Sequence, residues 1–195
     1  MLGRSACHPK GVLCLTDEPE LPLSPALLLA EEWSAAMGRP TRRGELLDGN
    51  VRSPLLFVAQ GNHGVLVRDH NGCIVVFLLV EISAEAKARI ASLPPPIQER
   101  GLRTLRHQLL SQTRCAFALS PSEPRTILAV DRIAVEQLIR ITKDDPGSFN
   151  RYADAIQETV NAAVRAFWFL GALVTEGDLG DGRTVKGPPP AGMYA

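Results

Sequence analysis

The sequence predicts an α+β domain in which a mostly antiparallel five-stranded sheet carries helices on one face, in the order α-βββ-α-ββ-α. Three apolar segments separated by tight turns between residues 54 and 82 indicate a meander, and two more between residues 115 and 133 indicate a hairpin. From the length of 195 residues we expect one domain over 23–174, with an extended N-terminal arm over 1–22 and a disordered tail over 175–195.

The first helix is expected to begin at Ser24-Pro25, because serine caps a helix N-terminus and proline at the first helical position loses no hydrogen bond. Gly38 and Pro40 should end this helix. The polar, arginine-rich stretch 38–53 is interpreted mainly as a connection, with a short strand at Glu45-Leu46-Leu47 as the alternative.

The meander should contain strands at residues 54–60, 65–69 and 73–82. Asn71-Gly72 is the favoured two-residue turn between the last two strands, since both turn positions take a positive φ. The continuous apolar character of Cys73–Ile82 indicates a strand that is buried on both faces.

Two helical segments follow, Ser83–Leu93 and about 97–111, and together they form the second α of the predicted order. A hairpin of strands 115–120 and 125–133 comes next, and Val135–Ile141 fits either an edge strand or a short helix. The last helix is expected to start at Asp145-Pro146, with apolar residues at spacings of three and four up to Leu170.

Composition and motifs argue against several functions. Twenty-one basic residues balance 21 acidic ones, and only 5% of residues are aromatic, which is not typical of a nucleic-acid binder. The sequence contains neither a G-x-S-x-G nucleophile turn nor a phosphate-binding glycine loop. We therefore expect a non-enzymatic protein without cofactor or metal.

Two alternatives stay open. His63, His70 and Cys73 would suit a metal-dependent regulator or enzyme, because the tight turn places His70 opposite Cys73. The arginine-rich second helix, with Arg100, Arg103 and Arg106, would suit a nucleic-acid-associated regulator.

The sequence also bears on localisation. The N-terminus shows no secretory signal, and the longest apolar run, Cys73–Val80, is far shorter than the roughly 20 residues that span a bilayer. We expect a cytoplasmic protein that does not bind membranes.

The order of elements over residues 24–174 resembles the type III secretion chaperone-like superfamily. The most particular part is the segment Thr126–Ile133 followed by a helix that contains Phe149 and Val160-Asn161-Ala162-Ala163. The resemblance implies a homodimer that binds an extended segment of a partner protein. The chain departs from secretion chaperones, which tend to be acidic, in its zero net charge, and its tails are longer.

If the chain binds a partner as this resemblance implies, we expect the contacts to come from sheet side chains near a groove and from two cations of the second helix. They are Phe57, Val65, Val67, Ile127, Val130, Arg100 and Arg103.

Overall fold

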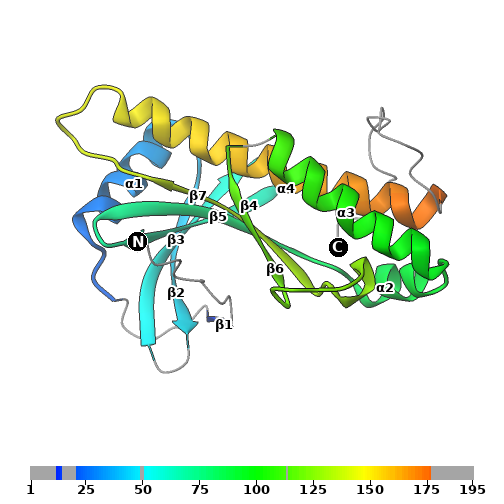
Figure 1. Ribbon diagram of the computed structural model, residues 1–195. Helices are drawn as coiled ribbons and strands as arrows, with labels where there is room; N and C mark the ends of the chain where they lie inside the picture. Colours follow the sequence, from blue (N-terminus) through cyan, green and yellow to red (C-terminus); the bar gives the residue numbers. More distant parts are fainter. Residues whose placement is uncertain (1–11, 15–20, 49–50, 113, 177–195) are drawn as a thin grey trace, which may run out of the picture. The chain divides into compact units, whose positions relative to one another are not determined.

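The computed structural model describes residues 12–14, 21–48, 51–112 and 114–176 (Figure 1). The chain divides into two compact units. Unit 1 comprises residues 1–77 and 137–157, and unit 2 comprises residues 78–136 and 158–195. The predicted arm over 1–22 and tail over 175–195 lie almost entirely outside the described residues.

The fold is α+β with an antiparallel sheet, as predicted, but five strands was wrong. Within the described residues the sheet contains six strands of five residues or more, and a three-residue strand, β1, adds a seventh in the order β1-β2-β3-β4-β5-β7-β6. The strands are β1 (Val12–Cys14), β2 (Thr41–Asp48), β3 (Val51–Gln60), β4 (His63–His70), β5 (Cys73–Glu81), β6 (Ala116–Ser120) and β7 (Arg132–Ile139).

The strand missing from the prediction is β2, which occupies most of the stretch expected to be a connection. It pairs antiparallel with β3 along its whole length. Two of its charged side chains form ion pairs: Arg43 pairs with Glu31 at 2.8 Å, and Glu45 pairs with Arg52 at 2.5 Å. The Arg43 guanidinium also lowers the pKa of Glu31. Charged residues are common on strands near a sheet edge, so β2 lacks the apolar alternation of a central strand.

Four α-helices accompany the sheet within the described residues: α1 (Pro25–Ala36), α2 (Ala84–Ala91), α3 (Pro95–Gln112) and α4 (Ser148–Glu176). After β1, the observed order is therefore α-ββββ-αα-ββ-α, which corrects the predicted order. The serine cap of α1 is confirmed, because Ser24 Oγ accepts a hydrogen bond from the Leu27 amide at 3.2 Å. Ser83 caps α2 in the same way, since its Oγ accepts from the Ala86 amide at 3.2 Å.

Helix α4 begins at Ser148, later than expected. The Asp145 carboxylate accepts a hydrogen bond from the Gly147 amide at 2.9 Å, so it closes a turn before the helix. Arg151 pairs with Asp145 and donates to Ser148 Oγ at 2.9 Å. The Arg151 guanidinium, assisted by the Gly147 amide, lowers the pKa of Asp145.

The second strand of the last hairpin is displaced along the chain. Residues 125–131, expected to be a strand, form a turn with a 3-10 helix at Ile127–Ala129, and β7 follows at Arg132–Ile139. The ambiguous segment Val135–Ile141 is thus mostly strand. The prediction of a strand here was wrong because Ile127 and Val130 are fully buried, so these residues are apolar for core packing and not because they belong to a strand.

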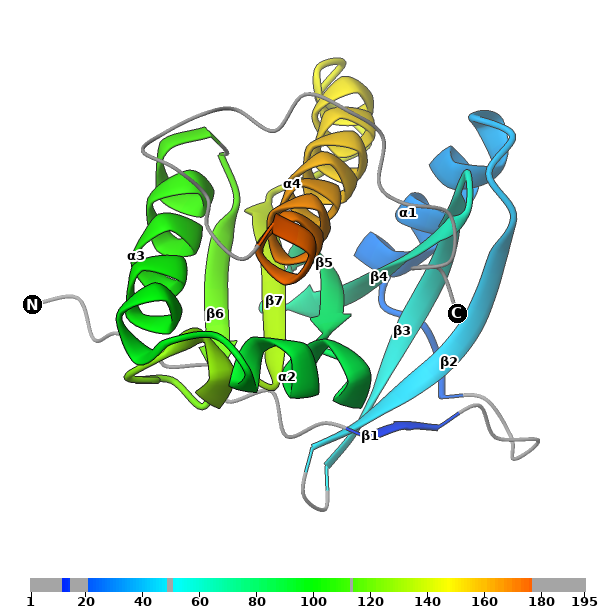
Figure 2. The ribbon, with the colours of Figure 1, turned by 90° about the vertical axis from the view of Figure 1, so that its right-hand side faces the viewer.

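In unit 1, α1 packs on β2, β3 and β4. In unit 2, α3 lies alongside β6 (Figure 2). Gly101 permits a close approach in that unit, because a Cβ there would lie 3.0 Å from a Leu173 methyl group and 3.5 Å from Ile127. As its continuous apolar sequence predicted, β5 is buried along nearly its whole length.

Candidate functional site

A cleft of about 560 Å³ opens in unit 1 and is lined by residues of α1, the β4–β5 turn and the loop that leads into α4. Its volume is in the range of ligand-binding clefts. We call it the α1 cleft. Its large apolar side chains are Leu28, Leu29 and Ile141, and its charged ones are Glu32, Asp69 and Lys143. Leu28 is 48% exposed, so an apolar side chain is available to a partner.

Two walls of the α1 cleft are joined by Asp69. Ser24 Oγ, which caps α1, donates to Asp69 Oδ2 at 2.6 Å. The Gly72 amide donates to Asp69 Oδ1 at 3.1 Å, and Asn71 and Gly72 have the positive φ angles, 53° and 76°, expected of the turn. One carboxylate therefore fixes both the start of α1 and the β4–β5 turn.

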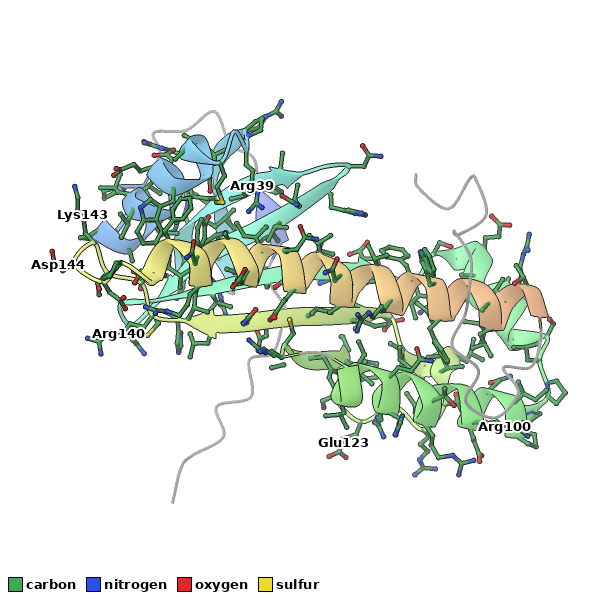
Figure 3. The ribbon with its side chains drawn as sticks, turned by 90° about the horizontal axis from the view of Figure 1, so that it is seen from above. Arg39, Arg100, Glu123, Arg140, Lys143 and Asp144 are labelled. Atoms are coloured by element: carbon green, nitrogen blue, oxygen red, sulfur yellow. The ribbon has the colours of Figure 1, made fainter. Side chains whose placement is uncertain are left out.

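The third wall is the loop between β7 and α4. The Thr142 amide donates to Ser148 Oγ at 3.1 Å, which ties the loop to the start of α4. Lys143 is exposed on the α1 side of this loop, whereas Arg140 lies on the opposite side (Figure 3). The rim of the α1 cleft thus carries the cation of Lys143 and, from α1, the carboxylate of Glu32.

A buried polar pair joins α1 to α4 within unit 1. The hydroxyls of Ser34 and Tyr152 are hydrogen-bonded at 2.8 Å, and both side chains are fully buried. The Trp33 ring meets Phe149 edge-on at 5.8 Å and Tyr152 at 6.1 Å. Burial, partly offset by the Ser34 hydrogen bond, raises the pKa of Tyr152 to about 12.

We expect the ionisation of this phenol to lower the stability of the folded chain at alkaline pH. Below pH 10, the ordinary pKa of tyrosine, Tyr152 is neutral in the folded and in the unfolded chain, so its full contribution to the free energy of unfolding is present. Between pH 10 and about 12 only the unfolded chain ionises, so about 3 kcal/mol is lost. Urea unfolding at several pH values measures the loss. Tyr152→Phe should show a smaller one, and an identical loss in both proteins would refute this assignment.

A smaller cleft, of about 350 Å³, contains one predicted site residue. It is lined in part by Pro40, Arg42, Phe57 and Gly64. Arg42 lies opposite Phe57 in the β2–β3 register, so their side chains share one face of the sheet. Phe57 is half-buried and therefore still offers apolar surface.

The other predicted sheet contacts are placed in the core. Their side chains have no exposed area, so they contribute to packing and are not accessible in this conformation; they are Val65, Val67, Ile127 and Val130. Arg100 and Arg103 are exposed on α3.

The alternative metal-ligating residues lie on β4 and β5. His63 pairs with Gln60 at one end of β4, and His70 pairs with Cys73 across the turn at the other. In the part of the chain that is described, no group of three or more His, Cys, Asp or Glu residues is placed to hold a metal ion.

Burial raises the pKa of the Cys115 thiol, which disfavours the reactive thiolate.

None of the helices in the described ranges is both long enough and apolar enough to cross a bilayer.

The α1 cleft was not predicted, although the sequence of α1 contains a signal for it. Leu27, Leu28 and Leu29 are consecutive and therefore point to different sides of α1, but only Leu27 is fully buried. A short helix that is apolar on several sides has more apolar surface than one core contact requires.

Comparison with known proteins shows similarity in fold. No family model matches the chain, and no curated protein matches it. The crystal structure of an uncharacterized protein from Methanothermobacter thermautotrophicus superposes with a TM-score of 0.60 at 18% sequence identity. The match covers 74% of this chain and 96% of the archaeal one. At this identity the similarity shows a shared fold.

Proposed function

We propose that the chain is a non-enzymatic protein-binding module that holds an extended, largely apolar segment of a partner protein in the α1 cleft. The observation that carries the proposal is the apolar lining, with Leu28 half-exposed beside Leu29 and Ile141. Side chains of an extended segment would cover Leu28 and Leu29 and remove their apolar surface from water, above Ile141, which is only 4% exposed.

The rim of the cleft supports a peptide as occupant. Glu32 and Lys143 carry opposite charges, and a peptide can supply both a donor for the carboxylate and an acceptor for the ammonium group. The Asp69 and Ser148 hydrogen bonds hold the walls in place, so the cleft is formed before the partner arrives.

The remaining parts of the proposal follow the resemblance to secretion-chaperone-like proteins. We propose an adaptor of this kind that is a homodimer, acts in the cytoplasm, and has its helices on one face of the sheet. Light scattering of the purified full chain tests the dimer, because a strict monomer in solution would contradict the proposed homodimer.

Peptide selection tests the cleft directly. Peptides enriched from a displayed random library on the immobilised full chain should carry several apolar residues. In fluorescence anisotropy, Leu28→Glu should weaken a selected peptide at least tenfold, since it replaces an apolar contact by a charge that must be desolvated.

Leu138→Glu is the matched control. It makes the same substitution at another exposed leucine of unit 1, which is 60% exposed and does not line the cleft. This variant should retain binding. The proposal fails if no peptide is enriched above background, or if Leu28→Glu binds as tightly as the parent chain.

A further inference from the structure

Two charged side chains that line the α1 cleft have no ion pair with any residue that the structure describes. They are Glu32, on α1, and Lys143, on the loop before α4. The neighbouring Glu31 differs from Glu32, because Arg43 pairs with it at 2.8 Å. Glu32 and Lys143 are both exposed, so each can still pair with a charged group of a ligand.

Asp69, the third charged residue of the cleft, already has partners within the fold. Its two carboxylate oxygens accept hydrogen bonds from the Ser24 hydroxyl and the Gly72 amide. Asp144 follows Lys143 in the sequence but does not line the cleft, and Figure 3 shows the two side chains pointing in different directions. The charges that remain for a ligand to pair with are therefore one cation and one anion, on different walls of the cleft.

The position of Glu32 on α1 sets a spacing for the ligand. Glu32 follows Leu28 by four residues, so the two side chains lie on the same side of the helix, about 6 Å apart along its axis. An extended chain rises about 3.3 Å per residue, and its alternate side chains share a face. In a segment that runs along α1, an apolar residue over Leu28 therefore places the residue two positions away at Glu32.

The length of the cleft bears on the class of ligand. Its lining on α1 reaches from Pro25 to Glu32, which is about 10 Å at 1.5 Å per residue. A free amino acid also carries one positive and one negative group, but its single residue covers only part of this length. About three residues of extended chain span it. The length therefore favours a protein segment over a small zwitterion.

We propose that the α1 cleft selects partner segments with a basic residue two positions from an apolar residue, together with an acidic residue. The apolar side chain covers Leu28, the basic one pairs with Glu32, and the acidic one pairs with Lys143. This inference rests on the proposed protein-binding function, and it adds the charge pattern of the bound segment.

Charge reversal on both partners tests the inference on the full chain. Peptides selected from the displayed library should carry the basic residue at this spacing. In fluorescence anisotropy, Glu32→Lys should weaken a selected peptide about tenfold, because an attraction becomes a repulsion. Replacing the basic residue of the peptide by glutamate should restore most of the affinity for this variant. Lys143→Glu should cause a similar loss, which replacing the acidic residue of the peptide by lysine restores, and both losses should shrink as salt is raised.

Two variants outside the cleft are the matched controls. Arg140→Glu reverses a charge on the opposite side of the loop from Lys143 (Figure 3), and Asp154→Lys reverses one at an exposed carboxylate of α4. Neither residue lines the cleft, so each variant should bind the selected peptides within twofold of the parent chain. Losses in these controls as large as those in the cleft variants would reveal a general charge effect and overturn the inference.

Failure of this inference is distinguishable from failure of the proposed function. If apolar peptides are enriched and Leu28→Glu weakens them, but the charge reversals change nothing, only the charge pattern is wrong. If no peptide is enriched, the protein-binding function fails and the charge pattern with it. Free leucine, titrated by calorimetry, is the competing ligand: binding tighter than that of the selected peptides would overturn the inference in favour of a small zwitterion.

Discussion

Tyr152→Ala is expected to lower the free energy of unfolding by about 4 kcal/mol. Tyr152 is among the largest side chains that are fully buried, and truncating an aromatic core residue costs about 3–5 kcal/mol through lost burial and the cavity left behind. The Ser34 hydroxyl, also fully buried, loses its partner at 2.8 Å, which adds to the loss. Urea unfolding followed by circular dichroism measures the change.

Tyr152→Phe separates the ring from its hydroxyl. It keeps most of the ring packing against Trp33 and removes the hydrogen bond, so we expect a loss of about 1–3 kcal/mol. Combining it with Ser34→Ala should cost less than the sum of the two single changes, because neither hydroxyl is then left unpaired. A loss below about 2 kcal/mol in Tyr152→Ala would contradict the assignment of this residue to the core.

Ile127→Asp should destabilise the chain by more than about 4 kcal/mol, which is comparable with the total stability of many domains. The Ile127 side chain has no exposed area, so aspartate would place a carboxylate in an apolar core without a partner. The variant should be unfolded or strongly shifted in urea unfolding. If Ile127 were instead a surface contact for a partner, the same change would leave stability nearly intact.

Ala129→Asp provides the comparison within the same 3-10 turn. Ala129 is exposed, so aspartate remains in water there and should change stability by less than about 0.5 kcal/mol. Equal stability of the two variants would mean that the 127–130 turn does not pack as described.

The parts of the fold that were predictable are those with strong local signals. Ser24-Pro25 and Asn71-Gly72 specify a helix start and a turn through their own backbone and side-chain chemistry, and both are found as predicted. The buried strand β5 could be recognised because every position from Cys73 to Val80 is apolar.

The predictions of secondary structure were wrong where tertiary contacts, and not local sequence patterns, determine the conformation. Strand β2 is held by cross-strand pairing and by ion pairs such as Arg43–Glu31, which no local pattern shows. The apolar residues of the 127–130 turn look like a strand because burial, like strand pairing, favours apolar side chains.

The candidate site was hard to predict for the same reason. The α1 cleft needs α1, the β4–β5 turn and the loop at Lys143 to meet, and these segments are distant in sequence. Phe57 is the one predicted sheet contact at a cleft, whereas Val65 and Val67 proved to be core, since sequence alone does not separate accessible from buried valines.

The double role of Asp69 has a thermodynamic consequence. Because its two oxygens restrain the Ser24 cap and the Gly72 turn together, the conformational entropy of arranging these walls is lost when the chain folds. A ligand that enters afterwards does not have to order them, so more of its contact energy appears as affinity. Asp69 can in this way strengthen binding by more than its own contact with a ligand would contribute.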